Sequence, residues 1–192
     1  MPLAIPVILG TVRSQRVGPR VGKYLVNRLQ ERGHKPVLVD PIEHPLPLLD
    51  KMYKEYGPGE APPVLERLAG IIKPADAYLI VSAEYNHSIP PALSNLLDHF
   101  LPEYYFKPSA IACYSPGAFG GVRAAMQLRA MLCEMGTPSI PSLLPFPKVQ
   151  DLLDENGQPK DERIRKSTDR FLSELEWYAE ALKAQRANGT PY

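Results

Sequence analysis

The stretch IPVILGTVRSQRVG, residues Ile5–Gly18, decides the fold. The apolar run Ile5–Leu9 is followed at once by a polar loop, and beyond the loop apolar residues recur with helical spacing. Short apolar runs without polar alternation are typical of strands that are buried on both faces. The stretch therefore predicts a strand, a loop and a helix, which together form the first half of a βαβ unit.

The same alternation continues along the chain. Apolar runs predict further strands at 37–39, 77–81 and 110–114, and a weaker one near 137–144. Five groups of apolar residues each share one helical face: Val21, Leu25 and Leu29; Val64, Leu68, Ile71 and Ile72; Leu93, Leu96, Leu97 and Phe100; Val122, Met126, Ala130 and Cys133; Phe171, Leu175, Tyr178 and Leu182. Five strands alternating with five helices predict an α/β fold, with a parallel sheet and helices on both faces. We expect residues 1–192 to form one domain.

Composition and charge exclude several classes of partner. The 22 Lys and Arg residues balance 21 Asp and Glu residues, so a net charge of +1 gives no reason to expect nucleic acid or an anionic membrane. The longest strongly apolar stretch, 77–83, is too short to span a membrane. Residues 1–10 lack a positively charged leader and a cleavage site, so we expect a cytoplasmic protein. Cys113 and Cys133 have no metal-ligand spacing, and we interpret both as core thiols.

Proline is in excess, with 22 residues in the chain, and its positions are informative. Prolines crowd the connection 41–63, the predicted helix start at 90–91 and the region 138–147 around the last predicted strand. A fixed φ suits loops and first helical turns, whereas proline is poorly tolerated inside a sheet. The pattern predicts stiffened loops, and it makes the last strand the weakest part of the fold prediction.

The loop after the first strand, 10–18, is rich in hydrogen-bond donors. It offers hydroxyls at Thr11 and Ser14, guanidinium groups at Arg13 and Arg16, and the amides of a helix N-terminus. Such donors suit a phosphate dianion. The loop has neither the dinucleotide-binding glycine pattern nor the lysine of a nucleotide-triphosphate loop, which disfavours both classes. The alternative is a hydrophilic turn with two solvated arginines.

Two further loops follow central strands and should meet the first at one edge of the sheet. In SAEYNHSIPP, 82–91, the prolines can begin a helix with Ser88 near its cap, while Tyr85 and Asn86 can contact the face and edge of a planar ligand. For Glu84 and His87 we favour solvent exposure over a role as catalytic acid or base, because the sequence shows no partner residue with which either could form a triad. In SPGAFGG, 115–121, three glycines allow close approach of the backbone to a ligand; a flexible turn is the alternative.

Together the three loops resemble the NADPH-dependent FMN reductase family, a branch of the flavodoxin-like fold. The resemblance rests on GTVR at 10–13, EYNHSIP at 84–90 and GAFGG at 117–121, in the family's order, and it covers about residues 4–145. The segment EYN, 84–86, is the most specific part of this resemblance. Departures are Ala83, where the family usually has proline, Pro116, and Ser94, where a lysine often precedes the asparagine matched by Asn95. The resemblance implies a doubly wound five-stranded sheet of order 2-1-3-4-5.

The resemblance also implies non-covalently bound FMN. The phosphate would be held by Thr11, Arg13, Gln15, Arg16 and Val17, and the ring system and ribityl chain would be bordered by Ala83, Glu84, Tyr85, Asn86, His87, Ser115, Pro116, Gly117 and Gly120. No protein residue is assigned a catalytic role, and no metal is implied, because the flavin carries the chemistry.

The function implied is hydride transfer from NADPH or NADH to FMN, and then to a small acceptor such as a flavin, a quinone, an azo dye or a metal oxyanion. A ping-pong scheme follows, since both substrates would use one flavin face. Family members usually form homodimers or homotetramers. The competing hypotheses are a flavodoxin-type electron carrier, disfavoured by the near-neutral charge, and a flavin-binding redox-sensing module.

Three further features have less specific interpretations. The connection 46–63, with Met52, Tyr53 and Tyr56, is either a lid over a partner subunit's flavin or a surface excursion. Trp177 and Tyr178 on the last helix are expected to pack rather than to contact substrate. The stripe at 93–100 suits either a subunit interface or packing on the sheet.

Overall fold

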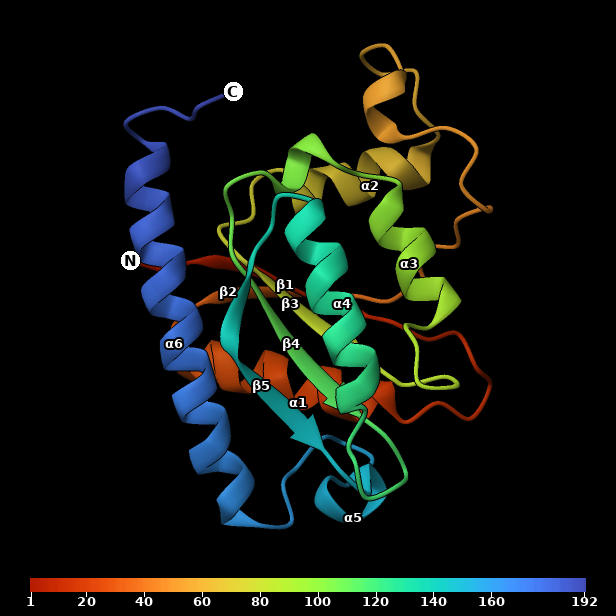
Figure 1. Ribbon diagram of the computed structural model, residues 1–192, viewed down its shortest axis with the longest axis vertical. Helices are drawn as coiled ribbons and strands as arrows, with labels where there is room; N and C mark the ends of the chain where they lie inside the picture. Colours follow the sequence, from red (N-terminus) through yellow and green to blue (C-terminus); the bar gives the residue numbers. More distant parts are fainter.

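The computed structural model, which describes residues 1–192, contains one five-stranded parallel sheet of order β2-β1-β3-β4-β5 (Figure 1). The strands are β1 (Ala4–Leu9), β2 (Lys35–Val39), β3 (Tyr78–Ser82), β4 (Ser109–Tyr114) and β5 (Ser139–Phe146). All four strand pairs are parallel, with a register irregularity in the β4–β5 pair between Ser109 and Ile111. The predicted fold class and strand order are confirmed.

The helices alternate with the strands as the sequence pattern predicts. They are α1 (Gly18–Glu31), α2 (Pro63–Ile72), α3 (Pro91–Asp98), α4 (Val122–Glu134), α5 (Val149–Leu152) and α6 (Glu162–Arg186), with 3-10 turns η1 (Tyr53–Glu55) and η2 (Pro102–Tyr104). The sequence did not predict α5 and the two 3-10 turns, because elements of three or four residues are too short to show a period. None of the helices is long and apolar enough to cross a membrane.

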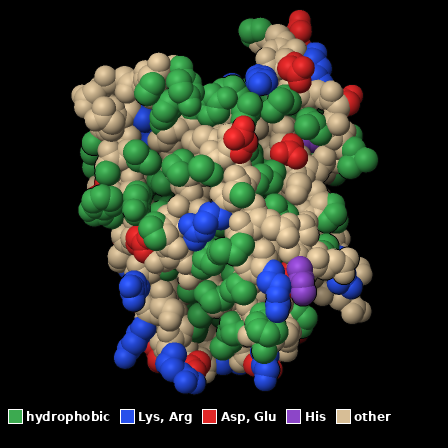
Figure 2. Space-filling model, in the orientation of Figure 1, with side chains coloured by type: hydrophobic (Ala, Val, Ile, Leu, Met, Phe, Trp, Pro, Cys, Tyr) green, Lys and Arg blue, Asp and Glu red, His purple; other side chains and the backbone are tan.

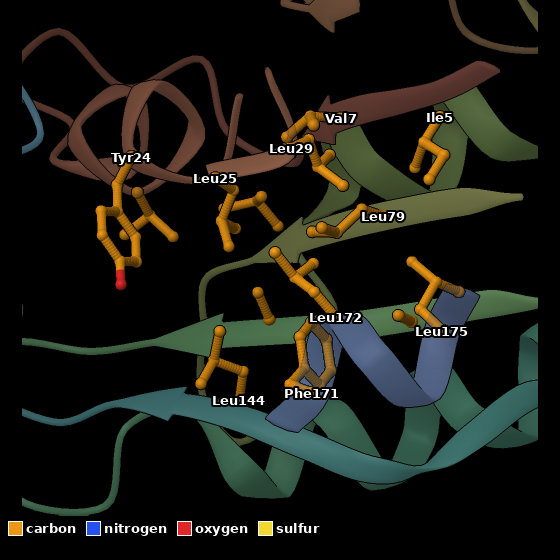
Figure 3. Packing of buried hydrophobic residues seen from close by; sticks show 14 of the residues in the cluster. Ile5, Val7, Tyr24, Leu25, Leu29, Leu79, Leu144, Phe171, Leu172 and Leu175 are labelled. Atoms are coloured by element: carbon orange, nitrogen blue, oxygen red, sulfur yellow. The ribbon is translucent and has the colours of Figure 1, made fainter. Parts of the chain in front are cut away.

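Each face of the sheet has its own apolar core. On one face, Val7 and Leu79 pack with Leu25 of α1 and with Leu172 and Leu175 of α6 (Figure 3). On the other face the cluster joins Ile8, Tyr78, Ile80 and Ile111 with residues of α2, α3 and α4. β1, β3 and β4 are therefore buried on both sides, which explains why their sequences lack polar alternation.

The prediction of which face of α4 packs against the sheet is wrong. Leu128 and Leu132 are fully buried with Ala124 and Ala125, whereas Met126, Ala130 and Cys133 are exposed and Val122 is half-buried. Two alanines let the helix approach the sheet closely, and their small side chains carry a weaker apolar signal than the methionine beside them. Figure 2 shows hydrophobic side chains at the surface of the face on which α3 and α4 lie.

The two cysteines differ in environment. Cys113 lies fully buried in β4, where burial raises the pKa of its thiol to about 12, so the thiol stays protonated at neutral pH. Its interpretation as a core thiol is confirmed. Cys133 is free and exposed, so the same interpretation is wrong for it, as a consequence of the rotated face of α4.

The structure also shows how Trp177 and Tyr178 of α6 and the apolar stripe at 93–100 pack. Trp177 is 65% exposed and contacts the ring of Tyr178 edge-on, so the expectation that it packs into the fold is wrong, while Tyr178 lies against the core. Leu93, Leu96, Leu97 and Phe100 are all buried in the core on the α3 side of the sheet. That stripe packs on the sheet and is not available as a subunit interface.

Several of the prolines singled out in the sequence lie where a fixed φ does little harm. Pro91 is the first residue of α3, preceded by Pro90 at the cap position, and Pro63 begins α2. Ser88 does not cap α3 with its side chain. Strand β5 holds Pro141 and Pro145, but it pairs with β4 alone, and both prolines are exposed. An edge strand tolerates them because one side of its backbone has no partner strand.

The connection 46–63 packs on its own subunit. The Tyr53 ring lies 5.5 Å from that of Phe100, and its hydroxyl donates to Glu66 at 3.0 Å. The side chain of Asn95 holds the backbone of the segment at Pro47 and Leu49. In Figure 1 the turn at 53–55 lies beside α2, away from the carboxyl ends of β3 and β4. That this segment covers the flavin of a partner subunit stays a prediction.

Candidate flavin site

A pocket of about 320 Å³ opens at the carboxyl ends of the central strands. Its lining comes mostly from the loops after β1, β3 and β4, with one residue of β4 and one of α5: Thr11, Arg13, Gln15, Arg16, Val17, Ala83, Glu84, Tyr85, Tyr114, Pro116 and Gln150. β1 and β3 are neighbours in the sheet, although β2 lies between them in sequence, so the pocket sits where the strand order reverses. Ligands of open parallel sheets bind at this point.

The pocket brings together most of the residues that the sequence singled out. Of the predicted set, Asn86, His87, Ser115, Gly117 and Gly120 do not line it. Tyr114 and Gln150 line it without having been predicted. Tyr114 is the last residue of β4, directly before the glycine loop, so its position was a usable signal; Gln150 lies in the four-residue helix α5, which gives none.

The loop after β1 contains two arginines, of which one is in an ion pair and the other is not. Arg16 is paired with Asp40 and also donates to the carbonyl of Thr11 at 2.7 Å. Arg13 is exposed and takes part in none of the salt bridges of the chain; its guanidinium carbon lies 5.8 Å from the Tyr85 ring centroid. Only Arg13 therefore has a guanidinium free to pair with an incoming anion.

A buried donor completes the anion-binding character of this loop. The hydroxyl of Thr11 is buried beside the Tyr114 phenol and makes no hydrogen bond of ordinary length and angle, so it can still donate to a ligand. The N-terminus of α1 begins at Gly18, and none of its first-turn residues is acidic. A guanidinium without an ion-pair partner, a buried hydroxyl and a helix N-terminus together fit a phosphate monoester.

Gly18 is required because α1 starts against the side chain of Tyr114. A Cβ at this position would lie 2.5 Å from the Tyr114 hydroxyl oxygen. Burial raises the pKa of that phenol well above its ordinary value, so a neutral hydroxyl faces the pocket at physiological pH. The close contact ties the loop after β1 to the end of β4.

Glu84 acts on the protein itself. One carboxylate oxygen accepts hydrogen bonds from the backbone N–H groups of Arg123 at 3.0 Å and Ala124 at 3.1 Å, in the first turn of α4, and the side chain is 10% exposed. A carboxylate at a helix N-terminus satisfies amides that otherwise have no partner and interacts favourably with the helix dipole. Glu84 therefore fixes the loop after β3 to α4, and the expectation that it is solvent-exposed is wrong.

The next turn of this loop is held just as firmly. The backbones of Tyr85 and Ser88 exchange two hydrogen bonds around Asn86 and His87, which both have positive φ, 51° and 63°. Positive φ at both central positions is the pattern of a type I′ turn, and Asn and His adopt it more readily than most residues. Gln127 of α4 bonds both His87 and Ser88. Hydrogen bonds within the protein therefore hold the turn in this shape without a ligand.

We expect Glu84→Ala to lower the free energy of unfolding of the apoprotein by about 1–2 kcal/mol, because the amides of Arg123 and Ala124 lose their acceptor. Glu84→Gln keeps an acceptor oxygen and should lose less than half as much. Urea denaturation followed by circular dichroism measures both. Equal losses for the two variants would show that the carboxylate does not cap α4 in this way.

The sheet order and the pocket at its switch point define this protein as flavodoxin-like. The sequence pattern of the NADPH-dependent FMN reductase family matches residues 3–151. The chain therefore belongs to this family, and it is an enzyme that binds FMN and uses NAD(P)H as electron donor. The resemblance stated from the three loops is confirmed.

Individual relatives agree with this assignment. The chain is 32% identical over 128 residues to an NAD(P)H-dependent FMN reductase of Pseudomonas aeruginosa, covering 64% of this chain and 69% of that protein. It is 30% identical over 142 residues to a quinone reductase of Pseudomonas putida, covering 70% and 72%.

Solved structures share the fold. FerB from Paracoccus denitrificans, a flavoenzyme NAD(P)H:acceptor oxidoreductase, superposes with a TM-score of 0.70 at 22% identity, covering 95% of this chain and 98% of that one.

Proposed function

We propose that this enzyme passes electrons from NAD(P)H, by way of bound FMN, to a small acceptor of the flavin, quinone, azo dye or metal oxyanion class, in a ping-pong mechanism. The observation that carries the proposal is the pocket itself: its lining includes Arg13, which has no ion-pair partner, and the buried hydroxyl of Thr11, and most of its walls come from the three loops of the family pattern. We assign residues 1–192 as one FMN-binding domain.

The residues present fit FMN. The phosphate would be held by Arg13, by the Thr11 hydroxyl and by backbone amides of the loop, with Gln15, Arg16 and Val17 around it. Ala83, Tyr85 and Pro116 would border the ring system and ribityl chain. The other predicted residues of the same loops do not line the pocket, and we keep them as proposed neighbours of the flavin: Asn86, His87, Ser115, Gly117 and Gly120. When bound, FMN supplies the hydride-accepting and electron-donating chemistry.

The protein's own contribution is positioning. The turn at 85–88 and the loop at 115–121 are fixed to each other through α4, so they present a preformed surface and do not need to be ordered on binding. No residue is needed as a nucleophile, and none of the pocket residues forms an acid–base pair of the triad kind. Nicotinamide and acceptor would use the same open face in turn, which is the basis for the ping-pong proposal.

Purified protein gives the decisive test. We expect a flavin absorbance spectrum that bleaches with one equivalent of NADPH under anaerobic conditions. Initial rates measured with NADPH and a benzoquinone should give parallel double-reciprocal lines. Intersecting lines would contradict the ping-pong scheme, and bound flavin with no turnover of NADPH and a quinone would favour the electron carrier or the redox-sensing module.

We also propose a homodimer or homotetramer in the cytoplasm. Large apolar side chains that this chain leaves exposed support assembly: Val12, Ile42, Leu48, Phe119 and Met126. Two free thiols suit a reducing compartment. Sedimentation velocity of the holoprotein tests the assembly, and a monomer at micromolar concentration would exclude it.

A further inference from the structure

The pairing of Arg16 with Asp40 separates the functions of the two arginines in the loop after β1. One terminal nitrogen of Arg16 lies 2.6 Å from one carboxylate oxygen of Asp40, and the other lies 2.5 Å from the second oxygen. Bidentate pairs of this kind are the most directional of the ion pairs that proteins form. The side chains are only 13% and 9% exposed, so solvent screens the pair little.

The pair joins the end of β2 to two points of the loop after β1. Asp40 directly follows β2, and its carboxylate also accepts from the backbone N–H of Ile42 at 2.9 Å. Arg16 donates in addition to the carbonyl of Thr11, which directly follows Leu9 and Gly10 at the end of β1. The guanidinium therefore links the end of β2 to the start and the middle of the loop that would hold the phosphate.

We propose that Asp40 is a positioning residue for FMN binding: acting through Arg16, it holds the loop 11–17 in the shape that receives the phosphate, while Arg13 supplies the net positive charge. This inference rests on the proposed FMN site. Asp40 does not line the pocket, and the sequence pattern of the loop gives no indication of it. The Arg16 charge is already matched by a carboxylate, which explains why a loop with two arginines has only one free cation.

A direct contact between Arg16 and the phosphate would predict the opposite effect of Asp40 on FMN affinity. If Arg16 were a direct phosphate ligand and Asp40 merely its resting partner, removing the Asp40 charge would release Arg16 and remove a nearby negative charge. FMN affinity would then rise. If Asp40 positions the loop, the same substitution must lower FMN affinity, although it makes the site more positive. The sign of a single substitution therefore separates the two roles.

The experiment titrates apoprotein with FMN and, separately, with riboflavin, and follows the quenching of flavin fluorescence. For Asp40→Asn we expect the dissociation constant for FMN to rise about five- to tenfold and that for riboflavin to stay within twofold. In an Arg16→Ala background, Asp40→Asn should no longer weaken FMN binding, because the residue through which it acts is gone. Arg16→Lys should weaken FMN binding too, since an ammonium cannot form the bidentate pair.

Asp76→Asn is the matched control. Asp76 is also a buried carboxylate held in an ion pair, with Lys183, but it lies next to Ala4 at the beginning of β1, the other end of the sheet. It should lower stability without changing the ratio of FMN to riboflavin affinity. An unchanged or higher FMN affinity in Asp40→Asn, or equal weakening of FMN and riboflavin, would overturn the inference. A wild-type protein that does not prefer FMN to riboflavin would instead contradict the FMN site itself.

Discussion

Arg13→Ala should raise the dissociation constant for FMN on the order of 10- to 100-fold. Arg13 is the one arginine of the loop without a carboxylate partner, and a charge-assisted hydrogen bond contributes about 1.5–3 kcal/mol. Because the side chain is exposed and its guanidinium carbon lies as far as 5.8 Å from the Tyr85 ring centroid, its loss should leave the unfolding free energy of the apoprotein within about 0.5 kcal/mol.

The controls for Arg13→Ala isolate the phosphate. Riboflavin affinity should change less than twofold, because riboflavin lacks the group that Arg13 would hold. Arg13→Lys should recover part of the FMN affinity, since it retains the charge but not the planar fork. Fluorescence titration of apoprotein measures all of these values. A variant that purifies with full flavin occupancy and wild-type FMN affinity would remove Arg13 from the phosphate site.

The contrast between the two arginines shows what the sequence could not reveal. The loop pattern predicts a phosphate site and gives Arg13 and Arg16 the same role, because both are arginines after one strand. Their different roles depend on Asp40, which is 24 residues further along the chain and comes beside Arg16 only because β1 and β2 are adjacent. Local pattern identifies which loops meet; it does not identify which side chains are already paired when they do.

Periodicity was accurate for strands and ambiguous for one helix. Four of the five predicted helical stripes point at the sheet, because large apolar residues dominate their inner faces. In α4 the large residue Met126 lies outside and two alanines lie inside, so spacing alone selected the wrong face. The role of Glu84 was missed for a related reason: a carboxylate that caps a helix forty residues away looks, in sequence, like an exposed one.

Gly121→Ala should be the most destabilising of the substitutions considered, lowering the free energy of unfolding by more than about 3 kcal/mol. Gly121 precedes α4 with a φ of +83°, and a Cβ there would lie 2.8 Å from the carbonyl oxygen and 3.0 Å from the amide nitrogen of Tyr114. Both are backbone atoms of a central strand, which cannot turn aside as a flexible side chain would. Either β4 or the start of α4 must therefore shift.

Gly33→Ala separates the two causes of that loss. Gly33 has almost the same φ, +82°, but nothing lies within 4 Å of its Cβ position, so alanine there meets only the left-handed backbone cost of about 1–2 kcal/mol. The difference between the two variants in urea denaturation is then the cost of displacing Tyr114. Since Tyr114 lines the pocket, Gly121→Ala should also weaken FMN binding, whereas Gly33→Ala should not. Equal destabilisation by the two alanines would show that the close approach of α4 to β4 does not constrain this corner of the pocket.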